Sequence, residues 1–128
     1  MEQVQELNAY LVVRRSGKLL LLKRHNGIWE SPGGGVEFGE NPKDAAIRET
    51  KEETGLRAKD AKLIGVTSAV FASNKKQKKH AIYAVYLAKS FSGKPTLSSE
   101  HSEFGWFSLS DARKMKLGLN VKPVLEMI

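Results

Sequence analysis

A helix with an acidic C-terminal face is the feature that most constrains this chain. Asn41 is a favourable N-cap, proline follows at the first helical position and Gly55 is placed to end the helix. The last turns hold Glu49, Glu52 and Glu53, which share one helix face. Like charges at this spacing cost roughly 0.2–0.5 kcal/mol per pair, and each anion near a helix C-terminus costs on the order of 0.3–1 kcal/mol. A bound divalent cation would offset these costs; the alternative is a solvated helix face.

The composition indicates one soluble globular domain over residues 1–128. The chain is 41% hydrophobic and 27% charged, and its length allows a single core. No apolar run approaches the roughly 18 residues that span a bilayer, and the N-terminus lacks the basic and apolar regions of a secretory signal. Cysteine is absent, which excludes disulfides and thiolate metal sites. We therefore expect a cytoplasmic protein without a membrane partner.

Charge is unevenly distributed along the chain. The net charge is +7, yet residues 34–56 contain six acids and three bases, so the remainder carries +10. An acidic patch in a basic surround suits a metal site whose further ligand is itself anionic; the alternative is a generally basic surface. The most basic stretch, Lys75–Lys79, is expected at a hairpin tip, either as a solvated loop or as a guide for polyphosphate or RNA.

Strand-like segments surround the helix and predict a mixed α+β or α/β/α layered domain. A hairpin is expected with a turn at Ser16-Gly17, and residues 28–31 predict a short strand that ends at Pro32 and a glycine loop. Further strands are expected at 62–72, 80–89 and 104–108, after the hairpin strands 7–15 and 18–24. Ser110 is expected to cap a short helix over 111–116, and a final helix is expected over 121–128.

The glycine and charged positions around the helix follow a fixed pattern. It runs Gly34, five residues, Glu40, seven residues, Arg48-Glu49-Thr50, one residue, Glu52-Glu53, one residue, Gly55-Leu56. This pattern resembles the signature of the Nudix hydrolase family (MutT-like), and WESPGG at 29–34 resembles the lead-in of that family. Thr50 is a departure, because the family usually has an aliphatic residue there. The resemblance implies a Nudix-type α/β/α sandwich with a mixed central sheet and a catalytic loop–helix–loop.

The same resemblance implies a Mg²⁺-dependent hydrolase that splits the pyrophosphate bond of a nucleoside diphosphate linked to a group X. We favour a purine nucleoside triphosphate, oxidised or not, that yields a monophosphate and pyrophosphate. The alternatives are an ADP-ribose or other nucleotide-sugar pyrophosphatase, and a non-catalytic module that binds a nucleotide or RNA. The expected partner is a small-molecule nucleotide, with nucleic acid as the less favoured alternative, and the protein is expected to be a monomer or a homodimer.

Carboxylates on one rigid face suit a hard cation, which takes oxygen ligands. Glu49, Glu52 and Glu53 are the candidate carboxylate ligands for Mg²⁺, with Mn²⁺ as a substitute. The resemblance adds the backbone carbonyl of Gly33 as a ligand. Arg48 is the candidate to hold a carboxylate through its planar fork and so to orient Glu49 or Glu53.

Members of the resembled family often need a further carboxylate outside this pattern. Glu103, three residues before Trp106-Phe107, is the candidate for this general base or extra metal ligand, and Glu100 and His101 are alternatives in the same loop. An exposed loop residue without a catalytic role is the competing interpretation for each of them. Glu40 either supports the metal site, as its counterpart in the family does, or complements the positive end of the helix.

The residues that select the substrate are less evident. Arg24, which ends the second strand, is a candidate contact for substrate phosphate. Asn120 lies in LNVKPVL, which loosely resembles the MutT-like segment that carries a purine-reading asparagine, since an amide reads both a donor and an acceptor. A surface arginine and a helix cap are the respective alternatives. Trp29, Phe71 and Tyr83 are candidates for stacking on a base, with core packing as the competing role.

Overall fold

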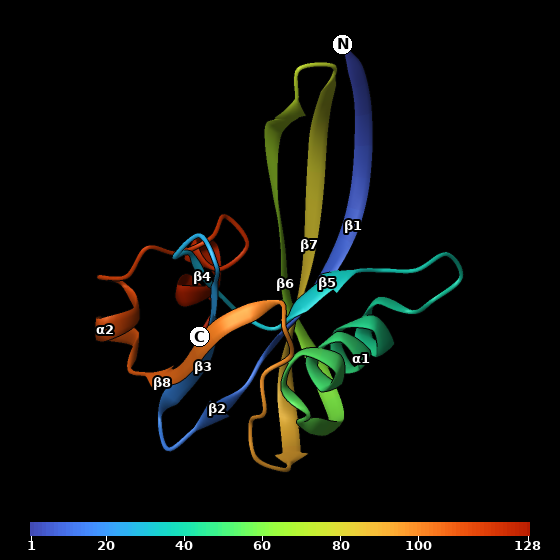
Figure 1. Ribbon diagram of the computed structural model, residues 1–128. Helices are drawn as coiled ribbons and strands as arrows, with labels where there is room; N and C mark the ends of the chain where they lie inside the picture. Colours follow the sequence, from blue (N-terminus) through green and yellow to red (C-terminus); the bar gives the residue numbers. More distant parts are fainter.

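The computed structural model describes residues 1–128 as two β-sheets between a long helix and two short helical segments (Figure 1). The strands are β1 (Glu2–Val12), β2 (Arg14–Arg15), β3 (Lys18–Arg24), β4 (Trp29–Glu30), β5 (Gly33–Gly35), β6 (Arg57–Asn74), β7 (Gln77–Ser92) and β8 (His101–Phe107). The helices are α1 (Pro42–Thr54), α2 (Leu109–Ala112) and the 3₁₀ segment η1 (Lys122–Glu126). None of them is long and apolar enough to cross a membrane.

The larger sheet is mixed and has the order β5-β1-β7-β6, with β1 parallel to β7 and the other pairs antiparallel. The second sheet joins β2, β3 and β4, and β8 pairs with β3. Leu20 and Leu22 pack in the core beneath α1, whereas Leu19 and Leu21 pack in the core beneath α2 and η1. Because both faces of β3 are buried, this strand is a continuous apolar run and not an alternating one.

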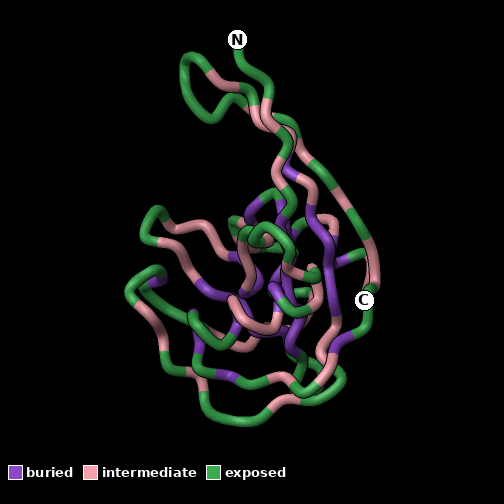
Figure 2. The backbone as a smooth tube through the Cα atoms, turned by 90° about the vertical axis from the view of Figure 1, so that its right-hand side faces the viewer, coloured by how far each residue is buried: buried purple, intermediate pink, exposed green.

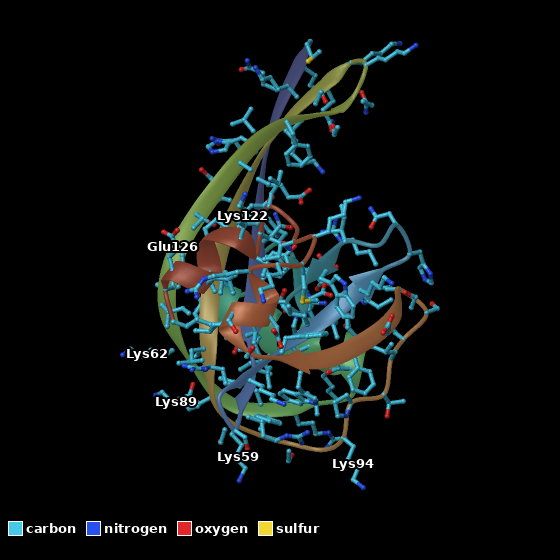
Figure 3. The ribbon with its side chains drawn as sticks, turned by 90° about the vertical axis from the view of Figure 1, so that its left-hand side faces the viewer. Lys59, Lys62, Lys89, Lys94, Lys122 and Glu126 are labelled. Atoms are coloured by element: carbon cyan, nitrogen blue, oxygen red, sulfur yellow. The ribbon has the colours of Figure 1, made fainter.

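The N-terminal part of β1 and the paired parts of β6 and β7 on either side of their turn project beyond the body as an arm that carries the N-terminus (Figure 1). Its residues are mostly exposed or half-buried, whereas the buried residues gather in the body (Figure 2). The first strand begins at Glu2 rather than at residue 7, because parallel pairing with β7 draws its polar start into the sheet. Pairing likewise extends β6 and β7 beyond the expected 62–72 and 80–89, so only Lys75 and Lys76 of the basic run lie in the turn. Figure 3 shows Lys59, Lys62, Lys89 and Lys94 in solvent at the opposite end of the sheet.

Three other expectations about local structure were wrong. The residues 33–35 expected in a loop form β5, because they pair with residues 8–10 of β1. The short helix starts at Leu109 and not at residue 111, since the hydroxyl of Ser108 accepts the N–H of Asp111 and caps it earlier. The final helix spans 122–126 and not the expected 121–128, and it is of the 3₁₀ type, in line with the poor stability of very short α-helices.

Candidate functional site

The helix that carries the acidic face has the ends that the sequence predicts. Asn41 Oδ1 accepts the N–H of Lys43 at 2.9 Å, and Pro42 occupies the first turn. Gly55 has a φ of 73°, in the left-handed region that favours glycine, and its N–H donates to the carbonyl of Lys51. These caps fix the length of α1 and hence the position of its last turn relative to β5.

The guanidinium of Arg48 lies among the carboxylates of this face. Its Nε and Nη2 donate to the two oxygens of Glu40 at 2.8 and 3.0 Å. Its Nη1 donates to Glu49 at 3.1 Å and to Glu52 at 3.2 Å. Glu40 also accepts the N–H of Glu37, and the hydrogen bonds from Arg48 are the main cause of its lowered pKa. The structure therefore places the planar fork on Glu40, with its remaining nitrogen bridging two candidate metal ligands.

Glycines bring the backbone of β5 directly against the acidic face. The N–H of Gly33 donates to Glu53 Oε1 at 2.8 Å. A Cβ at Gly33, whose φ is +151°, would overlap the carbonyl oxygen of Ala9, and a Cβ at Gly34 would lie 2.9 Å from the carboxyl carbon of Glu49. Larger residues at these two positions would displace the carboxylates or the strand.

Two of the three glutamates are poorly hydrated. Burial raises the pKa of Glu53 to about 9; the bond from Gly33 lowers it, and Glu100 and Glu30 raise it further. Burial also raises the pKa of Glu49, while Arg48 opposes this effect. Burial penalises a charged carboxylate unless a nearby cation compensates it. Arg48 contacts Glu49 and Glu52 but not Glu53, so the most buried carboxylate lacks a cation.

The structure places the candidates for the further functional residue, Glu100, His101 and Glu103, in different surroundings. Glu103 lies on β8 with its side chain 59% exposed, opposite Lys23 Nζ at 3.5 Å. Glu100 instead approaches α1 at Glu53, and it raises the pKa of that carboxyl group. A nitrogen of His101 and one carboxylate oxygen each from Glu53 and Glu100 lie within 4.8 Å of one another.

A cavity of about 360 Å³ contains both candidate substrate contacts, Arg24 and Asn120. Of the candidate aromatic residues, Phe71 and Tyr83 line this cavity, whereas the Trp29 ring packs edge-on against Phe107 in the core. Other lining residues are Tyr10, Ile28 and the segment Leu117–Leu119. Asn120 is buried and caps no helix, since η1 has no side-chain cap. Thus the helix-cap alternative for Asn120 was wrong.

Glu30 connects this cavity to the acidic face, and the sequence reasoning missed it. Its carboxylate accepts hydrogen bonds from Arg24 at 2.6 Å and from Asn120 Nδ2 at 3.3 Å, and its other oxygen lies 2.8 Å from His101 Nε2. Burial raises the pKa of Glu30, but the bonds from His101, Arg24 and Asn120 outweigh it, so the net shift is downward. The sequence feature that could have identified Glu30 is its charge within a predicted short strand, between Trp29 and Pro32.

The NUDIX domain model matches residues 5–127. The chain belongs to the Nudix family. Among similar proteins, an ADP-ribose pyrophosphatase of Methanocaldococcus jannaschii is 33% identical over 108 residues, which are 81% of this chain and 62% of the relative. The asymmetrical bis(5'-nucleosyl)-tetraphosphatase of Mus musculus is 32% identical over 112 residues, or 85% of this chain and 76% of the relative. The matched region is 61–68% of the length of three such relatives.

Solved structures agree with this assignment. A MutT NUDIX hydrolase from Burkholderia pseudomallei superposes with a TM-score of 0.88 at 32% identity, over 98% of each chain. The predictions of a MutT-like Nudix family member and of an α+β Nudix fold are thereby confirmed. The named pyrophosphatase relatives also support the expectation of a hydrolase that acts on phosphorus anhydrides.

Nudix hydrolases generally use divalent metal ions, and the residues of this Nudix site fit one. Glu53 is buried without a cation, and Glu49 packs against a glycine that leaves room for its carboxylate. The available donors are mainly oxygens, which hard divalent ions prefer. The donor chemistry and the uncompensated carboxylate therefore both match a divalent ion.

Proposed function

We propose that this Nudix protein is a divalent-metal-dependent hydrolase that cleaves the pyrophosphate bond of a nucleoside diphosphate linked to X. The observation that carries the proposal is the buried, uncompensated carboxylate of Glu53 beside Glu49 and the N–H of Gly33. Mg²⁺ is the proposed ion, with Mn²⁺ as a substitute, and Glu49, Glu52, Glu53 and the carbonyl of Gly33 are its proposed ligands. The bound ion would neutralise phosphate charge and lower the pKa of an attacking water.

The side chains around these ligands keep the carboxylates in position. Arg48 is anchored on Glu40 and restrains Glu49 and Glu52 through its remaining nitrogen. A bidentate arginine fixes both distance and orientation, whereas a flexible lysine fixes only a charge. Arg48 is therefore proposed as a positioning residue for two of the ligands.

Glu100 is now the stronger candidate for the general base, although the sequence favoured Glu103. It lies within 4.8 Å of the proposed metal ligand Glu53, whereas Glu103 pairs with Lys23 and has a side chain that is 59% exposed. Replacing the base by glutamine is expected to lower kcat by roughly 10²-fold or more. We expect that loss for Glu100→Gln and a near-normal rate for Glu103→Gln; the opposite pattern would return the role to Glu103.

The cavity is the proposed site for the nucleotide base, and a purine nucleoside triphosphate is the favoured substrate. Its aromatic rings, Phe71 and Tyr83, supply stacking surface. The Asn120 amide nitrogen donates to Glu30, which leaves Oδ1 without a partner as an acceptor for a base N–H group. Arg24, which keeps 40% of its side chain exposed beside Glu30, is the proposed contact for phosphate.

The named relatives favour a second candidate, cleavage of ADP-ribose or of a dinucleoside polyphosphate. A substrate panel with Mg²⁺, in which each product is identified, separates these from the triphosphates. Release of pyrophosphate and a monophosphate supports the favoured substrate, and release of AMP and ribose 5-phosphate supports ADP-ribose. Nucleotide binding without turnover of any compound, in the wild type as in Glu53→Gln, would contradict the enzyme proposal and favour a non-catalytic module.

A further inference from the structure

His101 is a buried histidine at the start of β8 with only one of its ring nitrogens bonded. Its side chain is 2% exposed, and Nε2 lies 2.8 Å from the Glu30 carboxylate. Its Nδ1 has no hydrogen-bond partner. Buried polar atoms are nearly always paired, so this nitrogen requires an explanation.

The contact with Glu30 determines which nitrogen carries the proton. An ionised carboxylate only accepts hydrogen bonds, and Glu30 already accepts from Arg24 and Asn120. Nε2 of His101 must therefore donate, and in the neutral ring Nδ1 then keeps a free lone pair. A carboxylate that holds one ring nitrogen so that the other can bind a metal is the usual arrangement of metal-bound histidines.

The surroundings provide the remaining ligands. A nitrogen of His101 and carboxylate oxygens from Glu53 and Glu100 lie within 4.8 Å of one another, and Glu53 and His101 are buried. Since Nε2 is engaged by Glu30, Nδ1 is the nitrogen with a lone pair to donate. One nitrogen and two oxygens form a mixed donor set, unlike the all-oxygen set proposed for Mg²⁺.

We propose that His101 Nδ1, Glu53 and Glu100 form a binding site for a divalent transition-metal ion, represented by Mn²⁺ and Zn²⁺. Imidazole nitrogen suits transition metals, whereas Mg²⁺ prefers oxygen ligands and retains its waters. The site rests on the proposed function because it shares Glu53 with the Mg²⁺ ligands. It implies that this protein binds transition metals through a ligand outside the acidic face of α1.

The direct test is pulsed electron paramagnetic resonance on the metal-free wild-type protein after addition of one equivalent of Mn²⁺. A directly coordinated imidazole produces a ¹⁴N coupling that an all-oxygen site lacks. We expect this coupling in the wild type and in His80→Gln, a matched control on the arm, and its loss in His101→Gln. Absence of the coupling in the wild type would overturn the proposal and requires no variant to fold.

Zn²⁺ and Mg²⁺ affinities, measured by calorimetry, provide a second test. Removing His101 or its carboxylate partner in Glu30→Gln is expected to weaken Zn²⁺ binding by about tenfold or more. Mg²⁺ binding is expected to change little in His101→Gln and to weaken in Glu52→Gln, while Glu52→Gln keeps its Zn²⁺ affinity. Equal Zn²⁺ affinities in the wild type and His101→Gln would refute the site. Failure of the proposed hydrolysis, by contrast, would appear as absent turnover with the ¹⁴N coupling intact.

Discussion

Replacing Glu53 by glutamine is expected to stabilise the metal-free protein at neutral pH. Glu53 is 4% exposed, and burial raises its pKa in the fold to about 9 from an ordinary value of 4.5. The folded protein therefore holds a proton on this carboxyl group that the unfolded chain releases. Glutamine keeps the shape, accepts the N–H of Gly33 through its oxygen and has no charge to desolvate.

The size of the effect follows from the two pKa values. The folded pKa lies above the unfolded one, so this carboxyl destabilises the fold progressively as pH rises from about 4.5 to about 9. At pH 7.5 the solution is about three pH units above the unfolded pKa and still below the folded one. The cost of keeping the proton on Glu53 in the fold is therefore ~4 kcal/mol, at 1.36 kcal/mol per unit. Relaxation of the site and water entry reduce this value, so we expect about 2–4 kcal/mol.

Urea unfolding of both proteins in EDTA, at several pH values from 4 to 8, measures this difference. The two free energies of unfolding are expected to agree near pH 4 and to diverge as pH rises, with Glu53→Gln the more stable. Saturating Mg²⁺ is expected to stabilise the wild type more than the variant, because binding adds about 2.7 kcal/mol at 100 times the dissociation constant. A difference that stays constant with pH, or a less stable variant in EDTA, would refute the burial explanation.

Three further changes have definite expected outcomes. Arg48→Lys loses the fork on Glu40, so we expect a roughly 10–100-fold fall in kcat with little change in melting temperature, measured by steady-state kinetics and calorimetry. Gly34→Ala is expected to keep its fold but bind Mg²⁺ more weakly, because the new Cβ displaces the flexible carboxylate of Glu49; unchanged affinity would contradict this. The N–H of Ala61, with two lysines, lowers the pKa of Asp60 to about 2, so Asp60 stabilises the fold above about pH 3.8 and loses this effect as pH falls towards 2. The melting-temperature deficit of Asp60→Asn should accordingly vanish near pH 2.

Local signals predicted helix α1 well. Asn41 and Gly55 act through hydrogen bonds and dihedral angles within a few residues, so their roles are readable without tertiary information. The strand limits were less predictable, because pairing with β7 extends β1 to Glu2 through polar residues with weak strand preference.

Within the site, contacts between residues far apart in the sequence were likewise less predictable than local ones. Glu100 and Glu103 are both acids close to β8, and no sequence period distinguishes the one that approaches α1 from the one that faces Lys23. Glu30 was missed because its partners Arg24, His101 and Asn120 are brought together only by folding.

The sequence by itself determined the family, the capped helix and the face that holds Glu49, Glu52 and Glu53, since these depend on spacing within one element. Only the tertiary structure decided that Glu53 is buried against Gly33 and that His101 is joined to Glu30. The physical reason is that burial and long-range hydrogen bonds set the charge and the free lone pairs of these groups. Both depend on which strands and loops meet, and local sequence patterns do not contain that information.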